Sequence, residues 1–284
     1  MQVYNQKYLN IAEDILRYGH QREGRNGVVR SIPFQDLMFD MRNDYFPLIT
    51  SRKIHYDGVF GEYAAIIRGP KNIKDFQKWG CNYWNEFGDP DTGELRLSYG
   101  NSWLDFNGVN QVEELLYNLK HHRYDRRHII SAWNPKGMQD LTLPPCHFLY
   151  QFYVDQTVAS FDHARNGPND NDTSDTLSMI MYSRSGDWMV GVPSDMVFGA
   201  TMLAHISALV NLKPGTLKLF VADAHIYLEH FTKAQEQIEN GYRWVDAKYS
   251  IQPQVGLNYN EFQPKHMDIY NYEPKGSIKY ELKT

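Results

Sequence analysis

The stretch Leu143-Pro144-Pro145-Cys146-His147-Phe148-Leu149-Tyr150-Gln151-Phe152-Tyr153-Val154 decides the fold, because it joins a rigid turn, a thiol and a strand. The aromatic and β-branched run from His147 to Val154 is expected to be a strand of the core. Pro144 and Pro145 fix the backbone before it and place Cys146 at its entrance. A lone cysteine is more often a small buried side chain than a nucleophile, so the rest of the chain must decide its role.

Further strand-like runs lie on both sides of this stretch. They are His128–Trp133, Leu177–Arg184 and Leu217–Ile226. Helical spacing or an Ala-, Leu- and Met-rich composition marks helices ending near His20 and covering Gly61–Arg68 and Gly199–Leu212. Because apolar helices need another layer to pack on, the sequence predicts an α+β layered fold. The polar segment GHQREGRNG, residues 19–27, is expected to be a loop.

The length of 284 residues is compatible with one large domain spanning 1–284, which is the expected organisation. Between two of the predicted strands lies ASFDHARNGPNDNDTSD, which is dense in Asn, Asp, Gly and Pro. These residues favour turns and bury little apolar surface, so we expect an exposed insertion at 159–176.

Composition excludes several classes of function. There are 29 Lys and Arg against 34 Asp and Glu, a net charge of −5, so nucleic acid is not expected to be an obligate partner. The two cysteines, Cys81 and Cys146, are too few for a disulfide framework or a four-cysteine metal site, and no metal is expected. No signal peptide, membrane span or glycine-rich phosphate loop is recognisable, so we expect a soluble, cytoplasmic protein without a membrane partner.

Two arginine-containing runs suggest a phosphate site. Arg126 and Arg127 precede a predicted strand, and Arg184 lies in Tyr182-Ser183-Arg184-Ser185-Gly186-Asp187. Guanidinium groups bind phosphate through paired hydrogen bonds, although each run alone is equally typical of a solvated turn. Together with Cys146 they indicate a nucleophile close to a phosphorylated substrate.

Five motifs occur in a fixed order along the chain. They are YGNSW at 99–103, DRRHIISAWNP at 125–135, LPPCHFLYQFYV at 143–154, RSGDWMVGVPSD at 184–195 and ADAHIY at 222–227. In combination they resemble the thymidylate synthases and the related deoxycytidylate hydroxymethylases, from about the Arg22–Arg25 loop to the C-terminal GSIKYELKT. The resemblance implies a layered α+β fold in which helices pack on a large mixed sheet and one sheet face forms a dimer interface.

The resemblance also implies a mechanism. Cys146 would add to C6 of a pyrimidine nucleoside monophosphate, so that C5 attacks the one-carbon unit of the co-substrate 5,10-methylenetetrahydrofolate. Arg184 would hold the phosphate and favour the thiolate. Glu62 would organise proton transfer near the base, and Tyr99 and His147 would belong to the same network.

The remaining assignments concern binding. Ser185 is implied to contact the phosphate together with Arg25, for which Arg22 is the alternative. Arg126 and Arg127 would be contributed across the interface of a homodimer. His225 and Tyr227 would bind the 3′-hydroxyl of the sugar. The residues implied on the folate side are Arg52, Trp84, Asp187 and Gly191.

Asp195 departs from the thymidylate synthase pattern, which has an asparagine facing N3 and the C4 substituent of the base. An amide suits the N3 donor and O4 acceptor of uracil, whereas a carboxylate cannot donate to O4. A carboxyl group can accept from N4 of cytosine and share a proton with N3. Asp195 therefore favours a cytosine nucleotide, as in the hydroxymethylases, which add water to the exocyclic methylene group.

Other departures concern the folate side and the C-terminus. Arg52 replaces a lysine, Asn85 an aspartate and Ser183 a glutamine, and the tail Glu281–Thr284 is polar rather than apolar, which suggests altered closure over folate. The leading hypothesis is conversion of dCMP to 5-hydroxymethyl-dCMP. Methylation or hydroxymethylation of dUMP, hydroxymethylation of CMP, and a noncatalytic nucleotide- or RNA-binding protein remain as alternatives.

Overall fold

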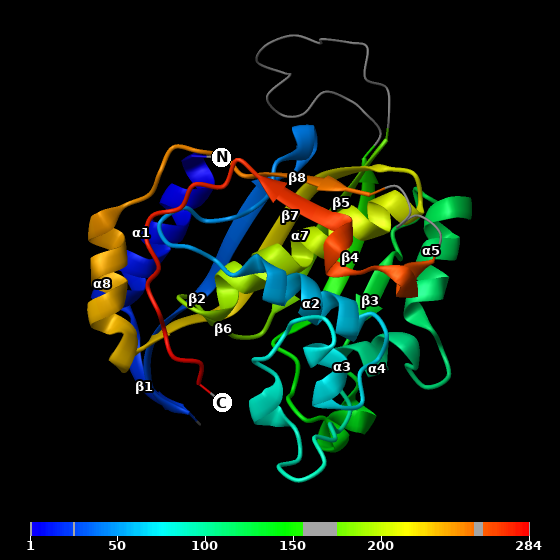
Figure 1. The fold of residues 1–284 in the computed structure, drawn as a ribbon, viewed down its shortest axis with the longest axis horizontal. Helices are drawn as coiled ribbons and strands as arrows, with labels where there is room; N and C mark the ends of the chain where they lie inside the picture. The colour runs from blue at the N-terminus through cyan, green and yellow to red at the C-terminus, as the bar shows by residue number, and fades with distance from the viewer. Residues whose placement is uncertain (1, 25, 156–174, 253–257, 284) are drawn as a thin grey trace.

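A seven-stranded sheet lies at the centre of the computed structural model, which describes residues 2–24, 26–155, 175–252 and 258–283. The strand order is β1-β2-β7-β5-β4-β3, with β6 beside β7 (Figure 1). The strands are β1 His20–Gly24, β2 Gly27–Asp40, β3 Ile129–Ser131, β4 His147–Asp155, β5 Thr176–Ser183, β6 Gly186–Asp187 and β7 Lys213–Tyr227. The β5 and β6 strands are parallel to β7 and the other pairs are antiparallel, so the sheet is mixed as predicted.

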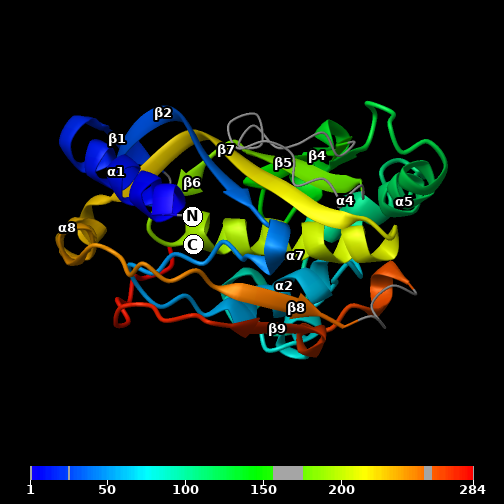
Figure 2. The same ribbon diagram turned by 90° about the horizontal axis from the view of Figure 1, so that it is seen from above.

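Helices and a small hairpin form further layers on one face of this sheet. The helices are α1 Gln2–Tyr18, α2 Tyr56–Ile66, α3 Ile73–Gln77, α4 Tyr99–Leu104, α5 Gln111–His121, α7 Gly191–Leu209 and α8 Phe231–Asn240. Figure 2 shows α7 against the sheet, α2 beyond α7, and the hairpin of β8 Lys248–Ile251 and β9 Met267–Tyr270 outermost. None of the described helices is long and apolar enough to cross a membrane.

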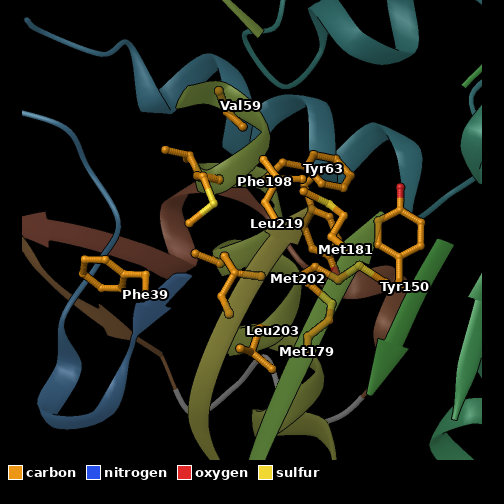
Figure 3. Close-up of a cluster of buried hydrophobic side chains, with 14 of the residues drawn as sticks. Phe39, Val59, Tyr63, Tyr150, Met179, Met181, Phe198, Met202, Leu203 and Leu219 are labelled. Atoms are coloured by element: carbon orange, nitrogen blue, oxygen red, sulfur yellow. The ribbon is translucent and has the colours of Figure 1, made fainter. Parts of the chain in front are cut away.

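The core lies between α7 and the inward face of the sheet. Along β5 the side chains alternate, and Leu177, Met179 and Met181 are buried. A parallel pair of strands needs a crossover connection, and α7 supplies it between β6 and β7. Since α7 is covered by the sheet on one side and by α2 on the other, it is apolar all round, and Phe198 and Met202 pack among the β5 methionines (Figure 3).

The predicted strands and helices are present, but the expected loop at 19–27 is wrong. His20–Gly24 forms β1, which pairs with β2 from His20 opposite Ser31 to Gly24 opposite Gly27. All five residues of β1 are exposed, and it is an edge strand that pairs with β2 through main-chain hydrogen bonds. The polar composition of this segment led to the wrong prediction of a loop where the structure has the strand β1.

The predicted insertion at 159–176 falls mostly outside the described residues, which resume at Asp175. The Asp175 carboxylate accepts hydrogen bonds from Arg123 Nη1 at 3.0 Å and from the Tyr124 hydroxyl at 2.8 Å. Thr176 is the first residue of β5. The last two residues of the predicted insertion therefore lie at and just before the start of β5.

The second face of the sheet carries partly exposed apolar side chains. Met38 on β2 is 59% exposed and Tyr153 on β4 is 59% exposed, and Tyr182 and Phe220 between them are half-buried with ring centroids 5.9 Å apart. These residues alternate with the core positions of their strands. This face, which we call the outer sheet face, thus combines apolar side chains with the ion pair of Asp36 and Lys218, whose Nζ and Oδ2 lie 3.6 Å apart.

Candidate active site

The pairing of β4 with β5 brings the cysteine and the central arginine together. His147 at the start of β4 lies opposite Ser183 at the end of β5, so that Cys146 and Arg184 are neighbours across the ladder. The Arg184 amide donates to the Cys146 carbonyl at 2.8 Å. Two residues 38 positions apart in sequence are thereby fixed by main-chain hydrogen bonding.

The side chain of Arg184 is oriented by the two prolines before the nucleophile. Its Nε donates to the Pro145 carbonyl and its Nη2 to the Pro144 carbonyl, each at 2.9 Å. The same Nη2 lies 3.7 Å from Cys146 Sγ. A cation held beside a partly exposed sulfur stabilises the thiolate, which is the nucleophilic form.

Tyr99 lies at the start of α4 and contacts the nucleophile from the opposite side. Its hydroxyl accepts a hydrogen bond from the Cys146 amide at 3.0 Å, and its ring packs on His147 with centroids 4.7 Å apart. Burial, with a smaller contribution from Cys146, raises the pKa of Tyr99 well above its usual range. The phenol therefore keeps its proton and can donate it to a ligand.

His147 and Asp195 form a second pair next to the thiol. His147 Nδ1 lies 2.5 Å from the Tyr150 hydroxyl, and its Nε2 lies 3.8 Å from Asp195 Oδ1. Burial lowers the pKa of His147 to about 3, so the ring is neutral at physiological pH. Burial, followed by the carboxyl groups of Glu62 and Asp187, raises the pKa of Asp195 well above its usual range.

Glu62 reaches the same region from α2. The Tyr83 hydroxyl donates to Oε2 at 2.6 Å and Trp84 Nε1 donates to Oε1 at 2.7 Å. Burial raises the pKa of Glu62, and these two hydrogen bonds partly oppose that effect. Trp84 itself is only 3% exposed and stacks on Phe76 with centroids 4.6 Å apart, so it presents little surface to a ligand.

The end of β7 gathers the residues expected to bind sugar and phosphate. His225 Nδ1 lies 3.4 Å from Ser185 Oγ, and the His225 and Tyr227 ring centroids are 5.5 Å apart on one face of the strand. Arg22 on β1 contacts Ser31 Oγ and bonds Asp223 Oδ1 at 2.7 Å, which places it beside this group. Arg25, the preferred candidate from the sequence, lies outside the described residues.

Arg126 and Arg127 lie away from this group, just before the edge strand β3. Both side chains are exposed, that of Arg127 to 84%, and Arg127 Nη2 bonds Asp125 Oδ2 at 2.5 Å. The chain itself therefore does not bring these two arginines to Cys146.

Two of the residues expected on the folate side, Asp187 and Arg52, contact the backbone of Met189. Asp187 Oδ1 accepts from the amides of Met189 at 3.0 Å and Val190 at 3.3 Å, and burial raises its pKa. Arg52 Nη2 donates to the Met189 carbonyl at 2.5 Å, and its guanidinium lies 5.4 Å from the Tyr280 ring centroid. At Gly191 a Cβ would meet nothing within 4 Å, so this position faces open space.

Two of the sequence departures have local partners. Ser183 is buried and donates to the Ser185 carbonyl at 2.9 Å, so it supports the backbone at the expected phosphate contact. Asn85 Oδ1 accepts from Gln77 Nε2 at 3.0 Å at the exposed end of the α3 region.

Sequence reasoning missed several residues that touch the site. Tyr83 holds Glu62, Tyr150 holds His147, and Tyr280 lies over Arg52. Each reads as an ordinary aromatic residue in sequence, and only the adjacency of Tyr83 to Trp84 hinted at a role. Within the described ranges, no group of three or more His, Cys, Asp or Glu side chains is placed to hold a metal ion.

Comparison with known proteins identifies the family of the chain. The sequence model of the family described as Thymidylate synthase matches residues 6–284. The chain is similar to Thymidylate synthase 1/2 of Encephalitozoon cuniculi (strain GB-M1), with 29% identity over 301 residues that cover 97% of this chain and 96% of the relative. Since the family match spans nearly the whole chain and the layered mixed sheet agrees with it, the chain belongs to the thymidylate synthase family.

Proposed function

We propose that this chain transfers a one-carbon unit from 5,10-methylenetetrahydrofolate to C5 of dCMP, and that water then adds to give 5-hydroxymethyl-dCMP. One-carbon transfer from this folate to C5 of a pyrimidine nucleotide is the reaction of the family to which the chain belongs. The observation that carries the choice of base is Asp195, which lies beside His147 in the cluster with Glu62.

The chemistry begins at Cys146. Its thiolate, stabilised by Arg184, adds to C6 of the ring, which breaks conjugation and makes C5 nucleophilic towards the one-carbon unit. After C5 has formed its new bond, loss of the C5 proton breaks the bond between the one-carbon unit and the folate nitrogen, which releases tetrahydrofolate and leaves an exocyclic methylene group. Water then adds to the methylene carbon, and elimination of Cys146 from C6 restores the ring. Glu62, held by Tyr83 and Trp84, and the Tyr99 phenol are the groups proposed to relay these protons.

Asp195 suits cytosine in either protonation state. A neutral carboxyl group donates to N3 and accepts from N4, and a carboxylate accepts from both N4 and a protonated N3. Uracil is matched only by the neutral form, which would donate to O4 and accept from N3. The raised pKa of Asp195 keeps that neutral form available, so dUMP is the second candidate substrate.

Water rather than hydride is proposed to complete the reaction. Glu62 is fixed through both carboxylate oxygens and has a raised pKa, which suits a group that orients a water molecule and exchanges a proton with it. The polar tail is a second supporting feature: Lys283 Nζ bonds Glu229 Oε2 at 2.5 Å, at the exposed margin of the site rather than in an apolar seal.

A homodimer is part of the proposal. The outer sheet face carries partly exposed apolar side chains on β2, β4, β5 and β7 beside the Asp36–Lys218 ion pair, and Arg126 and Arg127 are exposed near the edge of the same sheet. Packing of two outer sheet faces would carry these arginines to the phosphate site of the other copy. We also propose that residues 1–284 form one catalytic domain and that the protein is cytoplasmic.

The deciding experiment supplies 5,10-methylenetetrahydrofolate with dCMP, CMP or dUMP in separate reactions. The mass of the nucleotide product and the form of the released folate are measured together. Hydroxymethyl-dCMP with tetrahydrofolate is the expected result. Thymidylate with dihydrofolate would show that Asp195 is compatible with uracil and that hydride completes the reaction, and product from CMP would show that ribose is accepted.

A further inference from the structure

A β-bulge places Tyr150 on the same side of β4 as His147. Residues three apart in a regular strand point to opposite faces. In β4, however, His147 lies opposite Ser183 and Leu149 lies opposite Tyr182, so Phe148 is an extra residue in the ladder. The bulge reverses the alternation, and both His147 and Tyr150 are buried on the inner side. In Figure 3 the Tyr150 hydroxyl points away from Met179, out of the apolar cluster.

Counting hydrogens assigns the tautomer of His147. The Tyr150 hydroxyl lies 3.1 Å from the His147 carbonyl oxygen and 2.5 Å from His147 Nδ1. The carbonyl oxygen carries no hydrogen, so the hydroxyl hydrogen serves that contact, and the Nδ1 contact needs a hydrogen from the ring. If the ring hydrogen were on Nε2, the hydroxyl hydrogen of Tyr150 would be the only hydrogen available for both contacts. The contact without a hydrogen would then bring the lone pairs of two acceptor atoms together, which is unfavourable. The Nδ1–H tautomer satisfies both.

This tautomer decides what His147 presents to Asp195. We propose that Tyr150 is a positioning residue that holds His147 as the Nδ1–H tautomer, so that Nε2 offers Asp195 no hydrogen and Asp195 retains its own proton for N3 of the base. The proposal rests on the proposed function for the identity of that base. Free cytosine has no proton on N3 at neutral pH, so the enzyme must bring one.

The surroundings of Asp195 agree with a proton held there. The titratable groups that face it are Glu62 from α2, Asp187 from β6, Tyr99 from α4, and His147 and Tyr150 from β4. Two of these are carboxyl groups, and none carries a positive charge, because burial keeps His147 neutral. A hydrogen on Nε2, which lies 3.8 Å from Asp195 Oδ1, would stabilise an ionised Asp195, and the proposed role of Tyr150 is to keep that hydrogen on Nδ1.

The tautomer is measurable without any catalytic assay. In protein labelled with ¹⁵N in histidine side chains, two-bond correlation spectra distinguish a protonated ring nitrogen from a bare one. The His147 signals are assigned by their absence in His147→Gln. We expect Nδ1 to be protonated in the wild type and Nε2 to be protonated in Tyr150→Phe, which removes only the hydroxyl oxygen and its hydrogen. A wild type with hydrogen on Nε2, or a Tyr150→Phe variant with an unchanged tautomer, would overturn the proposal.

Tyr63 provides a matched control. Its hydroxyl lies 2.8 Å from Nδ1 of another buried histidine, His205, and neither residue belongs to the proposed site. Tyr63→Phe removes the same hydroxyl–imidazole contact elsewhere in the core. It is expected to alter the His205 signals only and to leave those of His147 in place.

The functional readout is the pH dependence of dCMP binding, measured by calorimetry without folate. Affinity is expected to fall as pH rises through the titration of Asp195, because the ionised group no longer brings a proton. In Tyr150→Phe the fall should move to lower pH by about one unit, the size expected when a carboxylate gains one hydrogen bond. Tyr63→Phe should follow the wild type, and an unshifted midpoint in Tyr150→Phe would contradict the proposal.

Failure of this inference and failure of the proposed function are distinguishable. If the wild type makes no hydroxymethyl-dCMP but shows the expected tautomers, the function is wrong and Tyr150 still positions His147. If hydroxymethyl-dCMP forms but the tautomer of His147 does not respond to Tyr150→Phe, the function stands and the positioning role is wrong.

Discussion

Arg184 and Cys146 are bound to each other twice, once through the Arg184 amide and the Cys146 carbonyl, and once through the guanidinium 3.7 Å from the sulfur. The first contact belongs to the sheet, and the second depends on the carbonyls of Pro144 and Pro145 that orient the guanidinium. The reactivity of the thiol is therefore a property of the β4–β5 pairing rather than of the cysteine alone.

Replacement of Arg184 by lysine is expected to lower the rate at which the Cys146 thiol reacts. An ammonium group cannot donate to two successive carbonyls and still lie beside the sulfur in the planar arrangement of a guanidinium. Alkylation of Cys146 by iodoacetamide at pH 7 should slow by about tenfold, and turnover should fall by about 10²-fold. Cys81, which is buried, serves as an internal control because it should remain unlabelled in both proteins. Equal alkylation rates would mean that Arg184 does not stabilise the thiolate.

Cys146→Ser separates an enzyme from a binding protein. A hydroxyl group is a far weaker nucleophile than a thiolate at neutral pH, so product formation should fall by at least about 10³-fold. Binding of the nucleotide, followed by calorimetry, should change little because the phosphate contacts remain. If nucleotide or RNA binds but the wild type and the variant are equally inactive, the chain is a noncatalytic binding protein on this fold.

Asp195→Asn is expected to change the preferred base. The amide donates to O4 and accepts from N3 of uracil, whereas its carbonyl cannot bring a proton to N3 of cytosine. The ratio of kcat/KM for dCMP to that for dUMP should fall by about 10–100-fold, corresponding to an unmatched buried polar group worth about 1–3 kcal/mol. Competition between the two nucleotides in one reaction measures this ratio directly, and an unchanged ratio would remove Asp195 from base recognition.

The same substitution should stabilise the protein at higher pH. Burial raises the pKa of Asp195, so the folded state holds its proton more tightly than the unfolded state. The protonated Asp195 therefore contributes its full share of folding stability below the unfolded pKa. This share falls as pH rises from the unfolded pKa towards the folded pKa, by up to about 1.4 kcal/mol per pH unit. Residual exposure of the Asp195 side chain, 17%, reduces the pKa shift and with it the total stability change. The margin by which the melting temperature of Asp195→Asn exceeds that of the wild type should therefore grow as pH rises above the unfolded pKa, about 4. A constant margin would indicate that Asp195 is ionised in the folded state.

The dimer proposal predicts complementation between inactive variants. One variant is Cys146→Ser and the other carries Arg126→Ala and Arg127→Ala. If the arginines act across the interface, a mixed dimer contains one site with an intact Cys146 and intact arginines from the other copy. Mixing after brief denaturation should restore up to about a quarter of wild-type activity, the statistical share of such sites. No recovery would place Arg126 and Arg127 outside the site.

The sequence predicted those strands in which the pattern of apolar and polar side chains follows the burial of one face. The runs that became β4, β5 and β7 alternate or are rich in β-branched and aromatic residues because one face lies on α7. The β1 strand was missed because an edge strand with exposed polar side chains has no such pattern. Its pairing with β2 depends on main-chain groups that every residue carries.

The site was predictable only in part, and the bulge in β4 shows why. Motif resemblance drew attention to Cys146, His147, Arg184 and Asp195, and the structure brings these four together. Regular alternation along β4 would put Tyr150 on the face opposite His147, and one extra residue in the ladder reverses this. The contribution of Tyr150 is invisible until the strand register is known.

The pairing of β2 with β7 places Val29 opposite Tyr227, and β5 lies between β4 and β7 in the sheet. Each contact between such distant parts of a chain carries the entropic cost of closing the long intervening loop. On the ribosome, Cys146 is synthesised well before Arg184, and His225 follows later still. The thiol is therefore made before the guanidinium proposed to activate it, and the two come together only when β4 and β5 pair.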